Sequence, residues 1–465
     1  MSASDRDPSP STTGGGLTYS AALAAIEARG RFGIRLGLGR VRALLRAMGD
    51  PQLAVRGALV GGTNGKGSVI ALAASALRAA DYRVGETPKP HLVTYRERIV
   101  VDGKPITADD FARLVAEAIP LTDRVARRHG QPTEFELLTA VMFRHLAEAA
   151  LDVALVEVGL GGRLDATHAW DGGVAVITNV TLDHTDRLGT TVAAIAREKA
   201  AIIERGDHAV TGAAGEALTV VRRRCARLGV PLTEVSSAPV LGWTRDALMV
   251  DLPHLGLTTV GLRGRHQAAN VATADALLDA LEAAGIATVS AAARREGYAA
   301  ARWPGRLELL EVAVPGRGTR EVLLDGAHNP DGAAALAVAL DDLRPYLAGG
   351  GASPEPLTIV WASMADKDVE GVIEAAARSR SLEGATVVCT AVDLPRAMPP
   401  EALAAAWRAR LPTATVLTAP DPGTALRLAL GRSSGPVVVA GSLYLVGAAR
   451  ARLVDDPALR DPDPA

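Results

Sequence analysis

Apolar runs and stretches with helical spacing alternate along most of the chain. The run RGALVGG (56–62) precedes SVIALAASALRAA (68–80), whose apolar positions have helical spacing. LDVALVEVG (151–159) and GGVAVITNV (172–180) are further runs typical of buried strands. The stretch QPTEFELLTAVMFRHLAEAA predicts a helix capped by Thr133. This alternation indicates a parallel sheet covered by helices.

A second series of strand-like runs follows residue 303. Its members are EVLLDGAHNP, LTIVWASMADKD, ATVVCTAVD, TATVLTAP and PVVVAGSLYLVG. Pro304 and Gly305 mark the boundary between the two series. We therefore predict an α/β protein with two domains: an N-terminal P-loop-type ATPase domain (17–300) with a mostly parallel sheet, and a smaller C-terminal Rossmann-like domain (303–465). Residues 1–16 are predicted to be a disordered tail, and 205–260 to hold short strands outside the main sheet.

Composition narrows the class of protein. The 465 residues include 50 basic and 52 acidic side chains, for a net charge of −2, which argues against a nucleic-acid binder that relies on a strong positive field. The two cysteines, Cys225 and Cys389, suit a reducing compartment. The N-terminus lacks the apolar core of a secretory signal, and no long uncharged apolar run is present. We expect a cytoplasmic monomer without a membrane or nucleic-acid partner.

The segment VGGTNGKGS (60–68) suggests a phosphate-binding loop, but it does not fit the common G-x-x-x-x-G-K-[ST] pattern. Val60 stands at the first glycine position, and Gly67 separates Lys66 from Ser68. Its glycines nevertheless let backbone N–H groups face an anion at the start of a helix. Lys66 would then supply a charge for phosphates, and Ser68 a hydroxyl for Mg²⁺. Taken alone, the segment also fits a glycine-rich turn before a helix.

Polar residues follow several of the predicted strands. In the first series these are Glu157, Asp183 and His184, with Lys199 on a following helix. In the second half, Asp325 and His328 also end a predicted strand, whereas Asn270 lies in LRGRHQAAN and Arg306 lies at the boundary between the two series. Ligands in open α/β sheets bind at the carboxyl ends of strands, where a carboxylate such as Glu157 is suited to hold Mg²⁺. Singly, each of these residues also has an ordinary structural explanation, such as a solvated Glu or an exposed helical Lys.

Taken together, the motifs resemble the folylpolyglutamate synthase/dihydrofolate synthase family within the Mur-ligase-like ATP-dependent amide ligases. The matching strings cover nearly the whole chain after residue 30, in order: FGIRLGLGRV, GTNGKGS, PHLVTYRERI, TEFELLTA, EVGLGGRLDAT, LDHTDRLG, REKAAI, GRHQAAN, PGRLE, DGAHNP, DKD and GSLYL. The loop therefore looks like the intact G-T-N-G-K-[GT]-[ST] class.

The resemblance implies a reaction and a set of site residues. ATP would phosphorylate a carboxylate of dihydropteroate or a reduced folate, and L-glutamate would attack the acyl phosphate to form an amide. The implied cofactors are Mg²⁺, ATP as substrate and a carbamylated Lys199. The implied catalytic residues are Lys66, Lys199 and His328. ATP would contact Gly62, Thr63, Asn64, Gly65, Lys66, Gly67, Ser68, Asn270, Arg306 and Asp325; metal would contact Ser68, Glu157 and His184; substrates would contact Thr133, Phe135, Asp165, Ala166 and Ser442.

Two positions depart from the family pattern. Lys89 takes the place of a serine that helps to bind a second Mg²⁺, and His168 takes the place of an asparagine. A protonated ammonium cannot ligate a metal, so either Lys89 replaces part of that metal's charge or Thr87 supplies the hydroxyl. Both departures are expected near the acceptor side. Two alternatives therefore stay open: a related ligase with a different carboxylate acceptor, and a nucleotide-binding protein that has lost catalysis.

Overall fold

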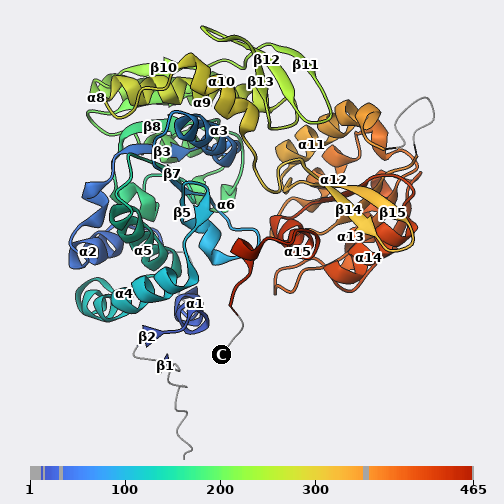
Figure 1. Cartoon of the computed structure of the whole chain (residues 1–465), viewed down its shortest axis with the longest axis horizontal. Helices are drawn as coiled ribbons and strands as arrows, with labels where there is room; N and C mark the ends of the chain where they lie inside the picture. Colours follow the sequence, from blue (N-terminus) through green and yellow to red (C-terminus); the bar gives the residue numbers. More distant parts are fainter. Residues whose placement is uncertain (1–11, 14–15, 31–34, 349–354, 463–465) are drawn as a thin grey trace, which may run out of the picture.

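The main sheet has eight strands and organises the first half of the chain (Figure 1). The computed structural model describes residues 12–13, 16–30, 35–348 and 355–462. The strand order is β10-β9-β8-β3-β7-β4-β5-β6. Strands β10 to β4 are parallel, and β5 and β6 add an antiparallel edge. The bounds are β3 Gly57–Gly61, β4 Val84–Thr87, β5 Val100–Val101, β6 Lys104–Pro105, β7 Val153–Glu157, β8 Gly173–Ile177, β9 His208–Thr211 and β10 Leu232–Glu234.

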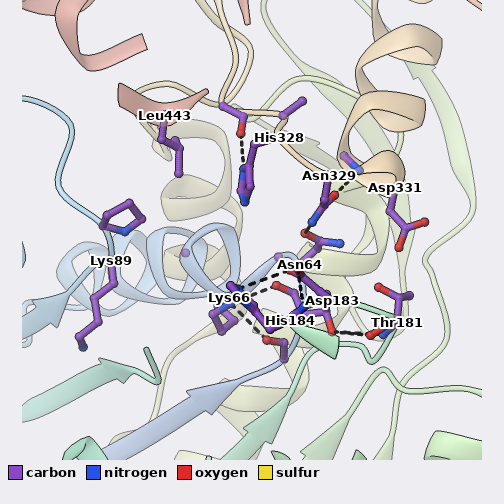
Figure 2. Close-up of a pocket in the computed structure, with 18 of the residues that line it drawn as sticks. Asn64, Lys66, Lys89, Thr181, Asp183, His184, His328, Asn329, Asp331 and Leu443 are labelled. Carbon is purple, nitrogen blue, oxygen red and sulfur yellow. Dashed lines mark hydrogen bonds and ion pairs between the residues drawn. The ribbon is translucent and has the colours of Figure 1, made fainter. Parts of the chain in front are cut away.

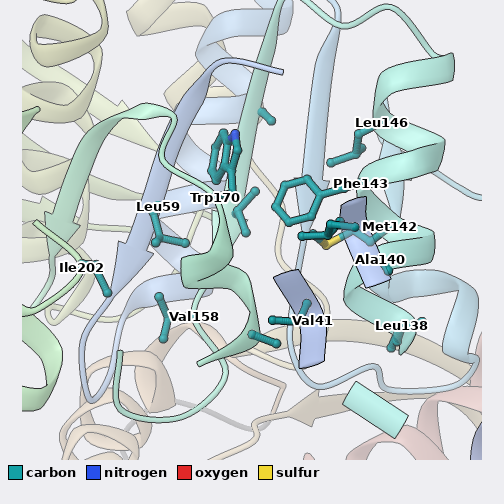
Figure 3. Close-up of a cluster of buried hydrophobic side chains, with 14 of the residues drawn as sticks. Val41, Leu59, Leu138, Ala140, Met142, Phe143, Leu146, Val158, Trp170 and Ile202 are labelled. Carbon is teal, nitrogen blue, oxygen red and sulfur yellow. The ribbon is translucent and has the colours of Figure 1, made fainter. Parts of the chain in front are cut away.

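Helices cover both faces of this sheet, because its central strands are apolar on both sides. Leu59 of β3 packs in one hydrophobic cluster, whereas its neighbours Ala58 and Val60 pack in another. On the Leu59 side, Phe143 and Trp170 are in contact, with ring centroids 5.6 Å apart (Figure 3). Helices on this side are α1 Tyr19–Glu27, α2 Gly39–Ala47, α4 Ala108–His129, α5 Glu134–Glu148, α7 Val192–Ala200 and α8 Gly215–Leu228; those on the other are α3 Lys66–Ala79, α9 Gln267–Ala283 and α10 Ala291–Ala300.

The prediction for residues 205–260 was partly wrong. Strands β9 and β10 pair in parallel with the main sheet, and β9 continues the ladder from β8. Only the later part forms a separate antiparallel sheet, with β11 Val240–Trp243, β12 Leu248–Leu252 and β13 Gly256–Val260. In the predicted tail, residues 1–11 and 14–15 lie outside the described residues, while β1 Thr12–Thr13 pairs with β2 Gly16–Leu17.

A six-stranded sheet lies entirely after the Pro304-Gly305 break, in the order β14-β15-β19-β16-β17-β18. All of its strands are parallel except β14, which pairs antiparallel to β15. The α/β class, with a second and smaller sheet, is confirmed. The bounds are β14 Glu308–Val314, β15 Gly318–Leu324, β16 Thr358–Trp361, β17 Thr386–Cys389, β18 Thr415–Thr418, β19 Val437–Ala440, α11 Pro330–Leu343, α12 Val369–Ala376, α13 Pro400–Arg410, α14 Pro422–Arg432 and α15 Leu443–Leu453.

Local sequence fixes several helix starts. The side chain of Thr133 accepts from the backbone of Glu136, and Glu136 in turn accepts from the backbone of Thr133, which is the predicted capping box of α5. Asn329 caps α11 ahead of Pro330, a residue suited to the first helical turn. Among the described residues, none of the helices combines the length and apolar character that crossing a membrane requires.

The contact between α3 and α10 is close because Gly297 has no side chain. A Cβ atom at this position would lie 2.3 Å from Cα of Ala76 and 2.4 Å from its backbone nitrogen. We predict that Gly297→Ala lowers the free energy of unfolding by about 1–3 kcal/mol, because the two helices must separate. The shift of the denaturant midpoint measures this effect.

Gly431→Ala in α14 is the matched control. No atom lies within 4 Å of the Cβ position there, so stability should stay equal or rise by up to about 1 kcal/mol. Equal effects of the two substitutions would contradict the close-contact explanation.

Candidate active site between the two sheets

The strand ends of both sheets open on one cavity of about 790 Å³. From the main sheet come the segments after β3, β4, β7 and β8, which are neighbours in the order β8-β3-β7-β4. From the second sheet come the segments after β15, β16, β17 and β19. The carboxyl ends of parallel strands are where ligands bind in open α/β sheets. The cavity therefore receives polar side chains from both sheets.

The predicted phosphate loop joins β3 to α3, and residues that follow β8 fix its backbone by hydrogen bonds. Asn64 N donates to Asn179 Oδ1 at 2.8 Å, and Thr178 Oγ1 donates to the Asn64 carbonyl at 2.6 Å. Gly62 has φ 146°, and a Cβ there would lie 1.9 Å from Thr178 Oγ1. Gly65 precedes α3 with φ 84°. The loop thus depends on glycine at points of close approach and left-handed backbone.

Two lysines meet at this loop. Lys66 Nζ donates to the carbonyls of Gly62 and Thr63, at 3.2 and 3.1 Å. Lys199 is buried on α7, and its Nζ donates to the same Gly62 carbonyl at 2.8 Å. Burial, together with the charge of Lys66, lowers the pKa of Lys199 to about 7. The structure therefore brings together two of the three predicted catalytic residues.

Glu157 ends β7 beside the loop, with Oε1 3.9 Å from Lys66 Nζ. Burial raises the pKa of this carboxyl group, and the charges of Lys66 and Lys89 oppose the rise. Ser68, in the first turn of α3, also lines the cavity. The charges of Lys66 and Lys89 thus both act on the Glu157 carboxylate.

The side chains fit Mg²⁺ held jointly with a nucleotide. Among the described residues, no group of three or more His, Cys, Asp and Glu side chains could hold a metal by itself. Mg²⁺ is commonly bound through one or two protein oxygens plus substrate phosphates and water. The Ser68 hydroxyl and the Glu157 carboxylate are oxygen ligands of this kind. They would hold the ion against phosphates that lie over the loop.

His184 and its neighbour Asp183 connect the two halves of the cavity. Asp183 Oδ1 lies 3.6 Å from Lys367 Nζ, which follows β16 of the second sheet. His184 Nε2 is 3.8 Å from Asp183 Oδ2, and burial lowers the pKa of the imidazole. Another bridge runs from Asn329 Nδ2 to Asn64 Oδ1, at 3.2 Å (Figure 2). These contacts hold the second sheet against the phosphate loop.

His328, the third predicted catalytic residue, reaches the cavity from the second sheet. Its Nδ1 lies 2.7 Å from the Gly326 carbonyl. Because a carbonyl only accepts, Nδ1 carries the hydrogen, and Nε2 keeps a lone pair when the ring is neutral. Burial lowers the pKa of His328 to about 4, so the ring is neutral at pH 7. Figure 2 shows the ring directed toward the region of Lys66.

The other predicted ATP contacts also line the cavity. Asn270 lies against the phosphate loop, since a Cβ on Gly65 would meet its Oδ1 at 2.3 Å. Arg306 and Asp325 lie on the wall formed by the second sheet. Both carboxylate oxygens of Asp325 accept backbone N–H groups, from Leu307 and Ala327. Burial raises the pKa of Asp325.

Only some of the predicted substrate residues line the cavity. Phe135 and Ser442 line the cavity, but Thr133, Asp165 and Ala166 do not. Thr133 caps α5, and Asp165 accepts from the backbone N–H groups of Leu160 and Thr167, which shapes the loop after β7. Their role in substrate binding remains a prediction, whereas their structural roles follow from these bonds.

The two departures from the family pattern occupy different places. Lys89 lines the cavity, whereas His168 lies away from it, with Nδ1 near the Arg163 carbonyl and Nε2 3.2 Å from Glu204 Oε1. The His168 ring is instead held by a partly buried contact with Glu204, and the expectation that both departures lie near the acceptor side stays a prediction.

Several residues in or beside the cavity were missed as site residues. Asn179 and Thr178 fix the phosphate loop, and Lys367 bridges the two halves. Arg98 and Arg396 also line the wall. The DKD string contained a signal for Lys367, because it follows a predicted strand of the second series. Thr178 and Asn179 act through contacts with a loop far away in the sequence.

Family models match both halves of the chain. Residues 60–278 match a model described as Mur ligase middle domain, and residues 310–451 match one described as Dihydrofolate synthetase, C-terminal domain. Together with the phosphate loop and the paired lysines, these matches define an ATP-dependent ligase of the Mur type.

Relatives and solved structures identify the branch. The chain is 33% identical to dihydrofolate synthase/folylpolyglutamate synthase of Bacillus subtilis over 94% of this chain and 99% of that protein. A Mycobacterium tuberculosis folylpolyglutamate synthase complexed with ADP and AMPPCP has a TM-score of 0.80 and 32% identity, covering 94% of this chain and 100% of that one. A bifunctional folylpolyglutamate synthase/dihydrofolate synthase with Mn, AMPPNP and L-glutamate bound has a TM-score of 0.76 and 28% identity, covering 94% and 98%. The chain belongs to the folylpolyglutamate synthase/dihydrofolate synthase family.

Gly62 gives a direct test of the phosphate loop. In Gly62→Ala the new methyl group would collide with Thr178 Oγ1 and strain the backbone. We predict at least a tenfold loss of affinity for AMPPNP by calorimetry, because the loop must move.

Gly39→Ala serves as the control, since no atom lies within 4 Å of its Cβ position on α2. Unchanged nucleotide affinity in Gly62→Ala would show that the loop geometry does not govern binding.

Proposed function

We propose that this chain ligates L-glutamate to the carboxylate of dihydropteroate, of reduced folates, or of both, with ATP as the phosphoryl donor. The observation that carries the proposal is the single cavity shared by the phosphate loop and the strand ends of the second sheet. The related structure with Mn, AMPPNP and L-glutamate bound supports the choice of nucleotide and amino acid.

In the first step, a carboxylate oxygen of the acceptor attacks the γ-phosphorus of ATP, and ADP leaves. The reacting groups are anions, so positive charge must surround the transferred phosphoryl group. Lys66 supplies a cation at the loop, and the backbone N–H groups at the start of α3 would face the phosphates. Mg²⁺ bound through Ser68 and Glu157 would neutralise further phosphate charge. The product is an acyl phosphate on the acceptor.

In the second step, the amino group of glutamate attacks the acyl carbon, and inorganic phosphate leaves as the amide forms. The glutamate nitrogen must lose protons before and during this attack. We assign His328 to this side of the reaction, because its neutral Nε2 can accept a hydrogen bond from an amino group. Ser442 is placed on the same wall.

We further propose that Lys199 is carbamylated. A neutral amine adds CO₂ and releases a proton, which leaves an anionic carbamate on Nζ. The site favours this product, because the carbamate would face Lys66 and replace the repulsion between two cations by attraction. The lowered pKa of Lys199, about 7, provides the neutral amine that the addition requires.

We predict that phosphate release requires ATP, Mg²⁺, L-glutamate and a pterin acceptor together, and that the acceptor gains the mass of one glutamyl residue. Mass spectrometry of the products measures this gain. Glu157→Gln should lower the rate at least 100-fold, because it removes the buried anion at the loop.

Glu198→Gln is the matched control, since Glu198 pairs with Arg163 near the surface. Phosphate release without any mass gain would leave an ATPase and contradict the proposed ligation.

Carbamylation of Lys199 predicts a ¹³C resonance of a carbamate in protein equilibrated with ¹³CO₂. The pKa lies below the ordinary lysine value, so the reactive neutral amine is gained as the pH rises through about 7. The resonance should therefore grow between about pH 6 and about pH 8. It should vanish in Lys199→Met and persist in Lys104→Met. A silent spectrum at the higher pH would refute the modification.

A further inference from the structure

The last described segment of the chain returns from the second half to the first. Helix α15 ends at Leu453, and residues 454–462, here called the strap, then run beside the segment that follows β4 (Figure 1). None of the strap residues is buried, so hydrophobic packing contributes little to holding it. Its place on the first half therefore depends on polar contacts.

Asp461 makes these contacts with two residues of the first half. Thr94 Oγ1 donates to Asp461 Oδ1 at 2.5 Å, and Arg96 Nε donates to the same oxygen at 3.3 Å. Arg96 Nη2 also donates to the Arg460 carbonyl at 2.8 Å. Arg96 is buried, and among the described residues Asp461 is the one carboxylate that pairs with it. Because a buried guanidinium without its anion is costly, this pair fixes the end of the strap.

The two residues that hold Asp461 belong to a compact turn, residues 92–97. The carboxylate of Glu97 accepts from three consecutive backbone N–H groups, those of residues 92–94. The turn also rests on α15, since a Cβ on Gly447 would lie 1.9 Å from the Leu92 carbonyl oxygen. The turn is thus joined to the second half twice, by α15 and by the strap.

Both ends of this turn continue into the wall of the cavity. Lys89 and Pro90 precede the turn, Arg98 follows it, and all three line the cavity. The backbone N–H of Lys89 donates to Glu157 Oε2 at 2.8 Å. The approach to the turn therefore also orients the carboxylate that we propose as a ligand of Mg²⁺.

We propose that Asp461 is a positioning residue for ligation. It holds the turn at residues 92–97, and with it the cavity wall on either side, in one place relative to the second half. Asp461 does not itself line the cavity, so it acts through the turn. This inference rests on the proposed function, in which groups from both halves must meet, and small misplacements of reacting groups slow such reactions strongly.

The phosphate loop is fixed independently of the strap. Asn179 and Thr178 hold its backbone from the segment after β8, whereas the strap is bonded to Thr94 and Arg96. Loss of the Asp461 carboxylate should therefore slow ligation and leave nucleotide binding unchanged. General loss of structure would impair both.

Hydrogen exchange, calorimetry and steady-state ligation with the full chain test the proposal together. In Asp461→Ala we expect the backbone N–H groups of residues 92–94 to exchange at least about tenfold faster, because the turn opens locally without its anchor. The Kd for AMPPNP with Mg²⁺ should stay within about twofold, while kcat/KM for the pterin acceptor falls at least about tenfold.

Two further variants of the strap calibrate this result. Asp461→Asn keeps an oxygen that accepts from Thr94 but loses the charge that pairs with Arg96, so its effects should be intermediate. Asp455→Ala is the matched control, because the exposed side chain of Asp455 pairs with Arg460 of the strap itself. All three measurements on this control should match the wild type.

Unchanged exchange at residues 92–94 in Asp461→Ala would overturn the proposal, and so would a parallel loss of AMPPNP affinity and ligation. If Asp461→Ala does not fold, as judged by its thermal unfolding, Asp461→Asn decides by the same criteria. Wild-type ligation that Asp461→Ala leaves unchanged would remove only this inference and leave the proposed function standing. Absence of ligation in the wild type would overturn both.

Discussion

The site depends on an excess of buried positive charge at the phosphate loop. Lys66 and Lys199 both donate to the Gly62 carbonyl, and the Glu157 carboxylate lies 3.9 Å from Lys66. Removing charges from water is costly unless they are paired, and part of this cost appears as the lowered pKa of Lys199. The arrangement is completed by anions that the chain does not itself supply, namely nucleotide phosphates and, in our proposal, a carbamate.

The second sheet turns this nucleotide site into a site for ligation. Asn329 reaches Asn64 on the loop, and Lys367 reaches Asp183 beyond β8. His328 comes from the same region with a neutral ring. A phosphoryl group held at the loop therefore faces side chains of the second sheet across a short distance. Such a shared cavity suits an acyl phosphate, which must react with glutamate before it is hydrolysed.

Much of this architecture could be predicted from the sequence. The strand-like runs predicted both sheets, and residues at strand ends, such as Glu157 and His328, lie on the cavity as expected. Errors arose where local pattern was weak: β9 and β10 are short, and their place in the main sheet depends on pairing with β8. Side chains that cap turns, such as Asp165, cannot be told from ligands by spacing alone.

Contacts between segments that are distant in the sequence could not be predicted either. Asn179 fixes a loop more than a hundred residues earlier in the chain, and His168 turns away from the cavity toward Glu204. The sequence shows that Lys89 departs from the family pattern, but it does not show where the Lys89 side chain points. Only the fold shows that its ammonium lies beside Phe135, away from Lys66.

The central claim is that the acceptor carboxylate is activated as an acyl phosphate inside this cavity. Labelling both carboxylate oxygens of the acceptor with ¹⁸O and weighing the released phosphate tests it most directly. The account predicts that each phosphate carries one labelled oxygen, because the carbon–oxygen bond to phosphate breaks when glutamate attacks. Amide product accompanied by unlabelled phosphate would contradict it.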